Sequence, residues 1–372
     1  MKRIKKVFLV LLMLDICLCV CISCHKNDDS IYFYGDIQVV EDNIANIETV
    51  ELKKVNLEGA NYGWFSVYDS LMIFMNPKLK DHFYQIFNVD TGMEIGTFCE
   101  RGGGPNEVTA VNPISQFFKE NNELKTMLFA PNEAELLIWN ITQSIKQSKT
   151  VVDKIIPYTW KTENEGACYN PLFVLNKNIL LAKVGVIPIG DDDATLPIYQ
   201  KRTVNTNKCL ENYFIYKQSI KNSESRIMPE NFFYSNDAIK PDGTKIVQAM
   251  LHLPQLNIID VQTGSIVGYR LDDNVDFSVF KGRKEIKNYY GRLHVDDDYI
   301  YVLYRGRALG EKNKTQENNI VYVFDWKGKL VQKIALNHTV NELWVDMTRN
   351  RLYITEPITD NVFYCDSVKG RV

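Results

Sequence analysis

After residue 30 the chain alternates between short apolar strands and short polar turns, with little helical periodicity. A typical unit has a strand over residues 64–67, a turn over residues 68–70 and a second apolar strand over residues 71–75. The turns are rich in Asn, Asp, Ser and Gly, which tolerate the tight backbone of a hairpin. The pattern therefore predicts a protein built from antiparallel β-hairpins.

This hairpin unit recurs six times at nearly even intervals. The second strands of the units begin at six apolar residues: Leu71, Leu124, Ile179, Ile246, Ile300 and Leu352. Successive starts are separated by 53, 55, 67, 54 and 52 residues, so one interval carries an insertion. A repeat of about 50 residues is typical of propeller blades rather than of solenoid turns. Two stacked β-sandwiches are the main alternative, but they would not need such even spacing.

Third and fourth strands are visible in several units. For example, residues 83–89 lead through a Thr-Gly turn into residues 94–98. The last unit has a third strand at residues 362–364 and no evident fourth strand. Residues 49–55 alternate well enough to supply it, and pairing with residues near 361–366 would close the ring and remove an exposed sheet edge. We therefore predict an all-β fold over residues 45–372: a six-bladed β-propeller of four-stranded antiparallel blades, closed by an N-terminal strand in the last blade.

The first 23 residues differ from the rest of the chain. Basic residues at positions 2–6 precede an apolar run over residues 7–20 that is broken only by Asp15. This is the pattern of a secretory signal peptide, and the run is short for a membrane span. A cytosolic protein with an apolar N-terminal helix is the alternative.

The end of this segment resembles a lipobox, the site at which a lipoprotein precursor is cleaved before a lipid-modified cysteine. Ile22, Ser23 and Cys24 fit its last three positions, although Cys21 stands where Leu is usual. We expect a signal peptide at residues 1–23, lipid on Cys24 and a polar tether over residues 24–44.

Charge and composition narrow the choice of partners. The formal net charge is −3, and about −6 after removal of residues 1–23, which argues against a nucleic-acid partner. No polybasic patch is present to assist membrane binding, so attachment would depend on the acyl chains. We expect an outer-membrane lipoprotein of the cell envelope, exposed to the periplasm or to the cell surface.

Four of the eight cysteines would remain beyond the lipidated one: Cys99, Cys168, Cys209 and Cys365. They form no C-x-x-C pair, so we expect no zinc site, and we expect no other metal or cofactor. Cys168 and Cys209 belong to the same repeat and form the candidate disulfide, which an extracytoplasmic compartment permits. Buried free thiols are the alternative.

The chain resembles the TolB-like six-bladed propeller lipoproteins of Gram-negative bacteria. The resemblance rests on the lipobox-like start, on the sixfold strand pattern and on the stretch from Arg101 to Glu107, Arg-Gly-Gly-Gly-Pro-Asn-Glu, after the fourth strand of the first unit. Such proteins commonly carry a Gly-x-Gly-Pro-Gly-Glu-like stretch there, and Asn106 replaces its second Gly in this chain. The resemblance implies a fold and an envelope location, but it implies no activity.

Two stretches are candidate binding sites. The glycines beside Arg101, Asn106 and Glu107 could offer backbone N–H groups to an anion; alternatively, this stretch is a tight crossover into the second blade, with Glu107 capping free amides. The long excursion over residues 270–290 is aromatic and charged, and could dock a sugar or peptide or cover a blade edge. Its candidate ligand-binding residues, together with a histidine that could face the central channel, are Arg283, Tyr289, Tyr290 and His294.

No catalytic motif is evident. The Asp triplets at residues 191–193 and 296–298 lack the spaced ligands of a calcium loop, and no Gly-x-Ser-x-Gly nucleophile motif is present. The leading hypothesis is therefore a binding or scaffold module for a protein, peptide or glycan. A metal-dependent hydrolase or lyase that uses the axial cavity, and a structural subunit of an envelope complex, are the alternatives. Three or four carboxylate, Asn or His side chains converging at the channel mouth would favour the enzyme.

Overall fold

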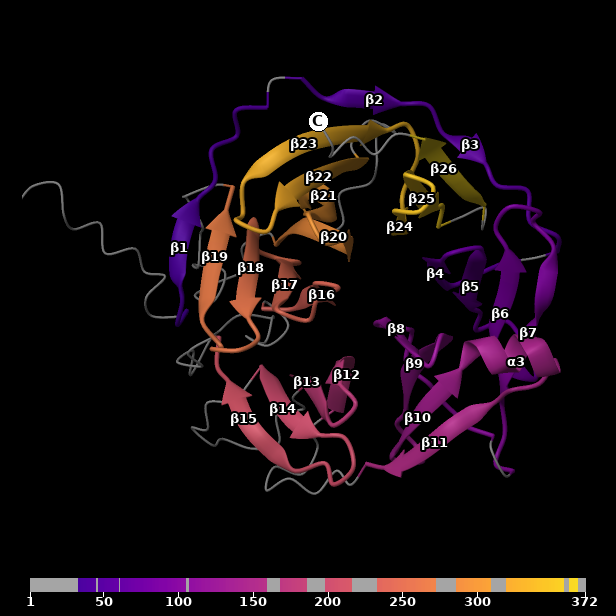
Figure 1. Ribbon diagram of the computed structural model, residues 1–372. Helices are drawn as coiled ribbons and strands as arrows, with labels where there is room; N and C mark the ends of the chain where they lie inside the picture. The colour runs from indigo at the N-terminus through magenta and orange to yellow at the C-terminus, as the bar shows by residue number, and fades with distance from the viewer. Residues whose placement is uncertain are drawn as a thin grey trace, which may run out of the picture.

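The computed structural model describes residues 33–44, 46–59, 61–104, 107–158, 168–185, 198–215, 233–271, 286–308, 319–357 and 361–366. Six β-sheets are arranged around a central axis, as Figure 1 shows. Each sheet is one blade with four antiparallel strands, so the predicted six-bladed propeller is confirmed.

The first three blades each contain four consecutive strands. Blade 1 has β4 (Trp64–Tyr68), β5 (Leu71–Met75), β6 (His82–Asn88) and β7 (Glu94–Glu100). Blade 2 has β8 (Phe117–Glu120), β9 (Glu123–Ala130), β10 (Glu135–Asn140) and β11 (Val152–Pro157), with helix α3 (Ile141–Gln147) before β11. Blade 3 has β12 (Cys168–Asn176), β13 (Ile179–Gly185), β14 (Tyr199–Thr203) and β15 (Cys209–Tyr213).

The other three blades also receive strands from the N-terminal part of the chain. Blade 4 has β16 (Ser235–Ile239), β17 (Lys245–Met250), β18 (Gln255–Asp260) and β19 (Ile266–Arg270), with β1 (Asp36–Val39) outside them. Blade 5 has β20 (Lys287–Val295), β21 (Tyr299–Ala308), β22 (Asn319–Asp325) and β23 (Leu330–Leu336), with β2 (Glu48–Val50) outside. Blade 6 has β24 (Glu342–Asp346), β25 (Arg351–Thr355), β26 (Val362–Asp366) and β3 (Lys53–Lys54).

The ring is closed by the predicted N-terminal strand. In β3, Lys54 stands opposite Phe363 and Lys53 opposite Tyr364 of β26, in antiparallel register. The N–H of Val55 extends this ladder by donating to the carbonyl of Val362 over 2.8 Å. Residues 53–55 and the last described strand therefore share blade 6, and β26 is paired on both sides.

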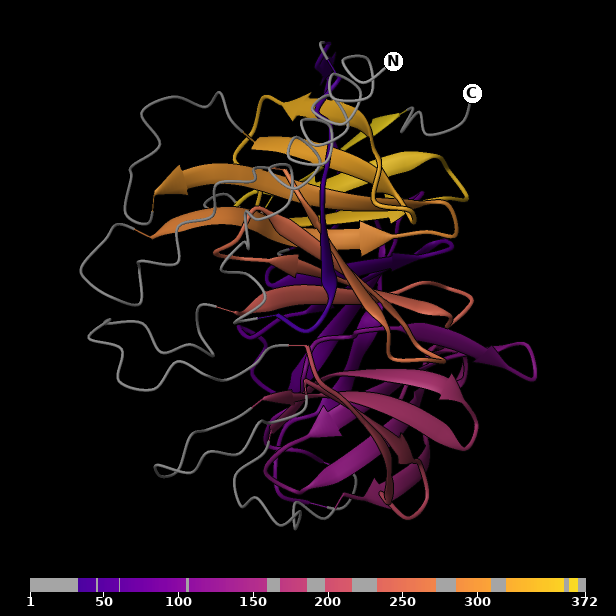
Figure 2. The same ribbon diagram turned by 90° about the vertical axis from the view of Figure 1, so that its left-hand side faces the viewer.

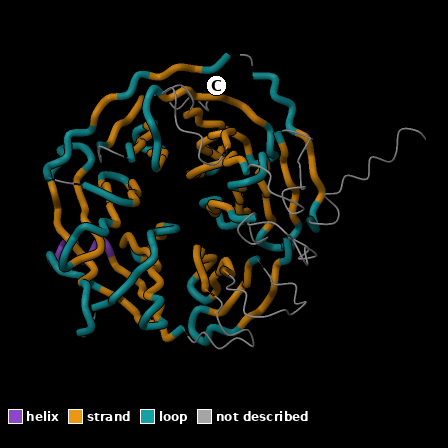
Figure 3. The backbone as a smooth tube through the Cα atoms, turned by 180° about the vertical axis from the view of Figure 1, so that it is seen from behind, coloured by secondary structure: helices purple, strands orange, loops and turns teal. Residues whose placement is uncertain are grey.

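The N-terminal belt, residues 33–44 and 46–59, extends further than the sequence predicted. It follows the outer edges of blades 4, 5 and 6, as Figures 1 and 3 show. Strand β1 pairs in parallel with β19, and β2 pairs in parallel with β23. Phe33 and Val40 are buried against the blades. The tether expected over residues 24–44 is wrong for residues 33–44, because their backbone and apolar side chains are part of the propeller; residues 24–32 lie outside the described part.

The hairpin turns are stabilised by their own side chains. In many of the described turns a side-chain oxygen accepts a hydrogen bond from the backbone N–H two residues further on, and examples are Asn88, Asn176, Asp242, Asp260, Asp296, Asp325 and Asp346. This local bond favours the turn over continued extension. The aspartate triplet that begins at Asp296 is one of these turns, whereas residues 191–193 lie outside the described chain.

Apolar side chains fill the space between neighbouring blades. Between blades 6 and 1, for example, Phe74 is fully buried and its ring contacts those of Phe65 and Phe87, with centroids 5.9 and 5.8 Å apart. Each such pair contributes about 0.5–1.5 kcal/mol beyond its buried area. Tyr353 and Val362 of blade 6 join the same cluster, so ring closure and core packing depend on each other at this seam.

The inner strands of the six blades begin at the same end of the axis. We call this end the crossover face, because the connections from blade to blade start there. The turns between the first and second strands and between the third and fourth strands of a blade lie at the opposite end, the hairpin face, as the antiparallel strand order requires and Figure 2 illustrates. Aromatic rings link four inner strands across the axis: Tyr68 contacts Phe117, Phe117 contacts Trp344, and Trp344 contacts His294, with centroids 5.3, 6.1 and 4.1 Å apart.

Within the described ranges, no helix has the length and apolar character that a bilayer crossing requires.

Candidate functional site

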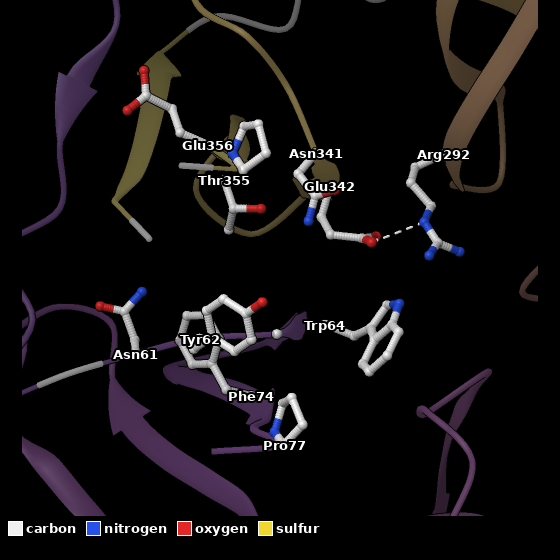
Figure 4. Close-up of a pocket in the computed structure, with 12 residues that line it drawn as sticks. Asn61, Tyr62, Trp64, Phe74, Pro77, Arg292, Asn341, Glu342, Thr355 and Glu356 are labelled. Carbon is white, nitrogen blue, oxygen red and sulfur yellow. Dashed lines mark ion pairs between the residues drawn. The ribbon is translucent and has the colours of Figure 1, made fainter. Parts of the chain in front are cut away.

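A cavity of about 260 Å³ lies between blades 1 and 6 at the crossover face. Figure 4 shows the side chains around it. Blade 1 and the residues before it supply Asn61, Tyr62, Gly63, Trp64, Phe74 and Pro77; blade 6 supplies Asn341, Glu342, Thr355, Glu356 and Pro357; blade 5 supplies Arg292. Aromatic rings, amides and a few charged groups therefore face one partly open cavity, which is the usual composition of a small-ligand site.

The cavity is built where strands begin and end. Trp64 starts β4, and Glu342 starts β24 directly opposite Thr355, the last residue of β25. Gly63 lets the chain pass close to the end of β5, because its φ of +98° suits glycine and a Cβ atom would lie 2.1 Å from the carbonyl oxygen of Met75. The strand ends thus hold the lining side chains in fixed positions.

Arg292 and Glu342 form the charged part of the lining. Nε of Arg292 donates to Oε1 of Glu342 over 2.8 Å, and Nη1 donates to Oδ1 of Asn236 over 3.3 Å. The amide of Asn236 in turn donates to the carbonyl of Gly291 over 3.0 Å. One guanidinium therefore joins the inner strands of blades 4, 5 and 6.

The Glu342 carboxyl is strongly affected by its surroundings. It is 8% exposed, and burial raises its pKa to about 7, although the positive charges of Arg292 and Arg305 act in the opposite direction. Near neutral pH this group therefore exchanges its proton readily, a property that is common in functional sites and also occurs in structural ion pairs.

Thr355 carries an unsatisfied hydroxyl. This residue is 5% exposed and lines the cavity, and its Oγ1, an atom with almost no solvent access, has no hydrogen-bond partner among the described residues. A buried polar group without a partner costs about 1–3 kcal/mol. A ligand that bonds this oxygen would remove that cost.

Two further charged groups stand at the edge of the cavity. The carboxylate of Glu356 points away from it and contacts Nδ1 of His338 at 2.6 Å. Nζ of Lys78 lies 3.5 Å from the centre of the Tyr62 ring. The carboxylate of Glu356 therefore pairs with His338 outside the cavity, and the ammonium of Lys78 lies beside the aromatic lining.

The predicted stretch from Arg101 to Glu107 is used in the crossover from blade 1 to blade 2. Nε of Arg101 donates to the carbonyl of His82 over 2.8 Å, and its guanidinium lies 3.8 Å from the centre of the Phe83 ring. Oε2 of Glu107 accepts from the N–H of Gly104 over 2.8 Å. These contacts favour the crossover interpretation, because the carboxylate occupies a place that an anion would need; Asn106 lies outside the described residues.

The remaining predicted ligand residues are on or beside β20 but outside the cavity. Tyr290 is fully buried, with its ring 5.6 Å from that of Tyr304. The N–H of Tyr289 donates to the carbonyl of Leu251 over 2.7 Å. His294 lies on Trp344 at the axis, and burial lowers its pKa, so the imidazole is neutral. Arg283 and Cys24 lie outside the described chain.

The predicted disulfide between Cys168 and Cys209 is wrong. Cys209 is a free thiol. The two residues lie on β12 and β15, the innermost and outermost strands of blade 3, with two strands between them. Three strand spacings amount to roughly 14 Å, whereas a disulfide needs Cα atoms within about 7 Å. Cys99 and Cys365 are buried free thiols.

Within the described ranges, no three His, Cys, Asp or Glu side chains are placed to share a metal ion.

Comparison with known proteins identifies the class. The family model of the TolB-like 6-blade propellers matches residues 64–348, so the chain belongs to this family. A crystal structure of a DUF4221 family member from Bacteroides vulgatus is similar, with a TM-score of 0.56 and 14% identity over 86% of this chain and 98% of that one. A candidate exported protein from Bacteroides fragilis is also similar, with a TM-score of 0.51 and 12% identity over 89% of this chain and 99% of that one. At these identities the likeness shows the fold alone, and no curated protein matches the chain in sequence.

Proposed function

We propose that this chain is a ligand-binding module of the cell envelope and that its ligand is a glycan held in the cavity between blades 1 and 6. Six-bladed propellers are often binding modules, and this one has a recess at the face from which its blade crossovers start. The observation that carries the proposal is the unpartnered Oγ1 of Thr355, buried in that recess beside an accessible aromatic ring.

The lining suits a sugar better than an apolar ligand. Trp64 is 37% exposed although it is a large apolar side chain, and Tyr62 adds a second ring. A sugar ring presents a C–H face that packs on such rings, and its hydroxyls both donate and accept hydrogen bonds. The amides of Asn61 and Asn341 and the hydroxyl of Thr355 supply matching polar groups.

Attachment to the outer membrane through lipid on Cys24 completes the proposal. The motif at residues 22–24 supports it, and a protein of similar fold from Bacteroides fragilis is described as a candidate exported protein. Mass spectrometry of the purified mature chain should find diacylglycerol or a third acyl chain on Cys24. A Cys24→Ser variant should lack the lipid and fail to sediment with membranes; an unmodified wild-type cysteine would refute the anchor.

A glycan array probed with the mature chain, solubilised in detergent, tests the binding function. Trp64→Ala and Thr355→Val should weaken retention at least tenfold on the same glycans that wild type retains. Phe214→Ala is the matched control, because Phe214 is another exposed aromatic side chain, 40% exposed, and lies just after the outer strand of blade 3. If no glycan is retained, or if the control weakens retention as much as the cavity variants do, the proposal is wrong.

Glycan cleavage is the second candidate function, and the observation that favours it is the Glu342 carboxyl. With a pKa raised to about 7, it is suited to protonate a leaving group near neutral pH. Retained glycans incubated with the protein should then gain new reducing ends or unsaturated ends, and Glu342→Gln should abolish this. Unchanged glycans would leave binding as the function.

A further inference from the structure

The guanidinium of Arg292 has a hydrogen-bond donor available for a ligand. Its Nε and Nη1 contact Glu342 and Asn236, while Nη2 has no hydrogen-bond partner among the described residues. The side chain is 39% exposed and lines the same cavity as Trp64, as Figure 4 shows. A group that accepts hydrogen bonds could therefore approach Nη2 while its carrier rests on the indole ring.

Cationic groups lie in and beside the cavity, whose own lining holds Arg292, Glu342 and Glu356. Both Arg292 and Arg305 act electrostatically on one carboxyl, that of Glu342. Lys78 adds an ammonium over Tyr62, and the carboxylate of Glu356 is directed toward His338. The cations favour an anionic group over a cationic one at Arg292.

We propose, building on the glycan-binding function above, that the ligand is an acidic saccharide, one that carries a carboxylate or a sulfate, and that Arg292 binds this anionic group. A guanidinium pairs with either group through charge-assisted hydrogen bonds. The volume of about 260 Å³ lies just below the usual range for small-molecule sites, and suits one or two sugar units rather than a folded partner. The neutral lining, two amides and a hydroxyl beside aromatic rings, suits the uncharged part of a sugar.

Glu342 makes this recognition dependent on pH. When ionised it neutralises Arg292, and when protonated it leaves the guanidinium charge to the ligand. The charged groups that act on Glu342 are Arg292 from β20 and Arg305 from β21. Thr355 on β25 and Trp64 on β4 also line the cavity, but their side chains do not titrate. Binding of an acidic saccharide therefore takes up a proton, and affinity rises as pH falls from 8 to 6.

Pairs of acidic and neutral oligosaccharides distinguish the preference for an acidic saccharide from glycan binding in general. Oligosaccharides bearing hexuronic acid or sulfate are compared with the same oligosaccharides after carboxyl reduction or desulfation. Wild type should bind the acidic member of a pair at least tenfold more tightly, and Arg292→Met should bring both members to the same affinity. Lys208→Met is the control, because it removes one positive charge from an exposed turn of blade 3, away from the cavity.

Arg292→Met leaves Glu342 buried without its partner and could unfold the chain. The double variant Arg292→Met/Glu342→Gln removes both charges together, and its melting temperature shows whether it folds. Loss of the acidic preference in the folded double variant supports the inference. Equal wild-type affinity for acidic and neutral members overturns the inference and leaves the glycan-binding function standing. Retention of no saccharide, or of acidic peptides only, overturns both.

Discussion

Replacement of Glu342 by glutamine tests the electrostatics of the cavity. Burial raises the pKa of this carboxyl from 4.5 to about 7. The folded chain therefore holds the proton more tightly than the unfolded chain does. The stability contributed by Glu342 is fully present below pH 4.5, decreases between pH 4.5 and 7, and is lost above pH 7.

The expected magnitude follows from the size of this shift. Each pKa unit corresponds to about 1.4 kcal/mol, so ionised Glu342 lowers the free energy of unfolding by about 3 kcal/mol relative to its protonated form. Glutamine resembles the protonated carboxyl in shape and carries no charge. Glu342→Gln should thus leave stability nearly unchanged at pH 4.5 and increase it by roughly 2–3 kcal/mol at pH 8.

Urea unfolding followed by circular dichroism, at both pH values, measures this difference. Asp297→Asn serves as the control, because Asp297 is an exposed carboxylate in a hairpin turn, and it should show no such gain at pH 8. A Glu342→Gln variant that is less stable than wild type at pH 8 would refute the reasoning, because the ion pair with Arg292 would then outweigh the cost of burial.

Three further substitutions test other parts of the structure. Phe33→Ala removes a buried ring of the N-terminal belt and should cost about 3 kcal/mol, measured by urea unfolding; a loss below about 0.5 kcal/mol would mean that the belt does not contribute to stability. Gly63→Ala places a Cβ atom 2.1 Å from the carbonyl oxygen of Met75 and should cost at least about 2 kcal/mol and weaken glycan binding; a variant with wild-type melting temperature would contradict this. Thr355→Val replaces an unpartnered buried hydroxyl by a methyl group, so it should raise stability by up to about 1 kcal/mol while it weakens binding; a less stable variant would show that the hydroxyl is already satisfied.

The propeller could be predicted from the sequence because each blade repeats the same local pattern. The second strands begin within one residue of the predicted positions; β5 begins at Leu71 and β13 at Ile179, as predicted, and β9 begins at Glu123 rather than Leu124. Closure by residues near 49–55 could also be predicted, since a missing fourth strand leaves an edge that the fold must cover.

Parallel pairing of the belt could not be predicted, because it has no local signature. Residues 36–39 are a short mixed strand without a hairpin turn, and their partners in β19 are more than 200 positions away. The disulfide prediction was wrong for a related reason. Two residues of one repeat lie close together only when their strands are neighbours, and β12 and β15 are opposite edges of the blade.

The cavity was missed because its residues resemble ordinary strand residues. Trp64, Arg292 and Glu342 come from three blades and meet only after the ring closes. The available signal was that Trp64 and Glu342 each begin an inner strand. The stretch from Arg101 to Glu107 stood out instead because of its glycines, yet its charged side chains bond neighbouring backbone.

A crystal structure of the mature chain with an acidic oligosaccharide selected on the array tests the central claim most directly. We predict a sugar ring against Trp64, its anionic group on Nη2 of Arg292 and a hydroxyl bonded to Oγ1 of Thr355. A saccharide bound at the hairpin face or along the outer blade edges, with the cavity between blades 1 and 6 unoccupied, would contradict the account.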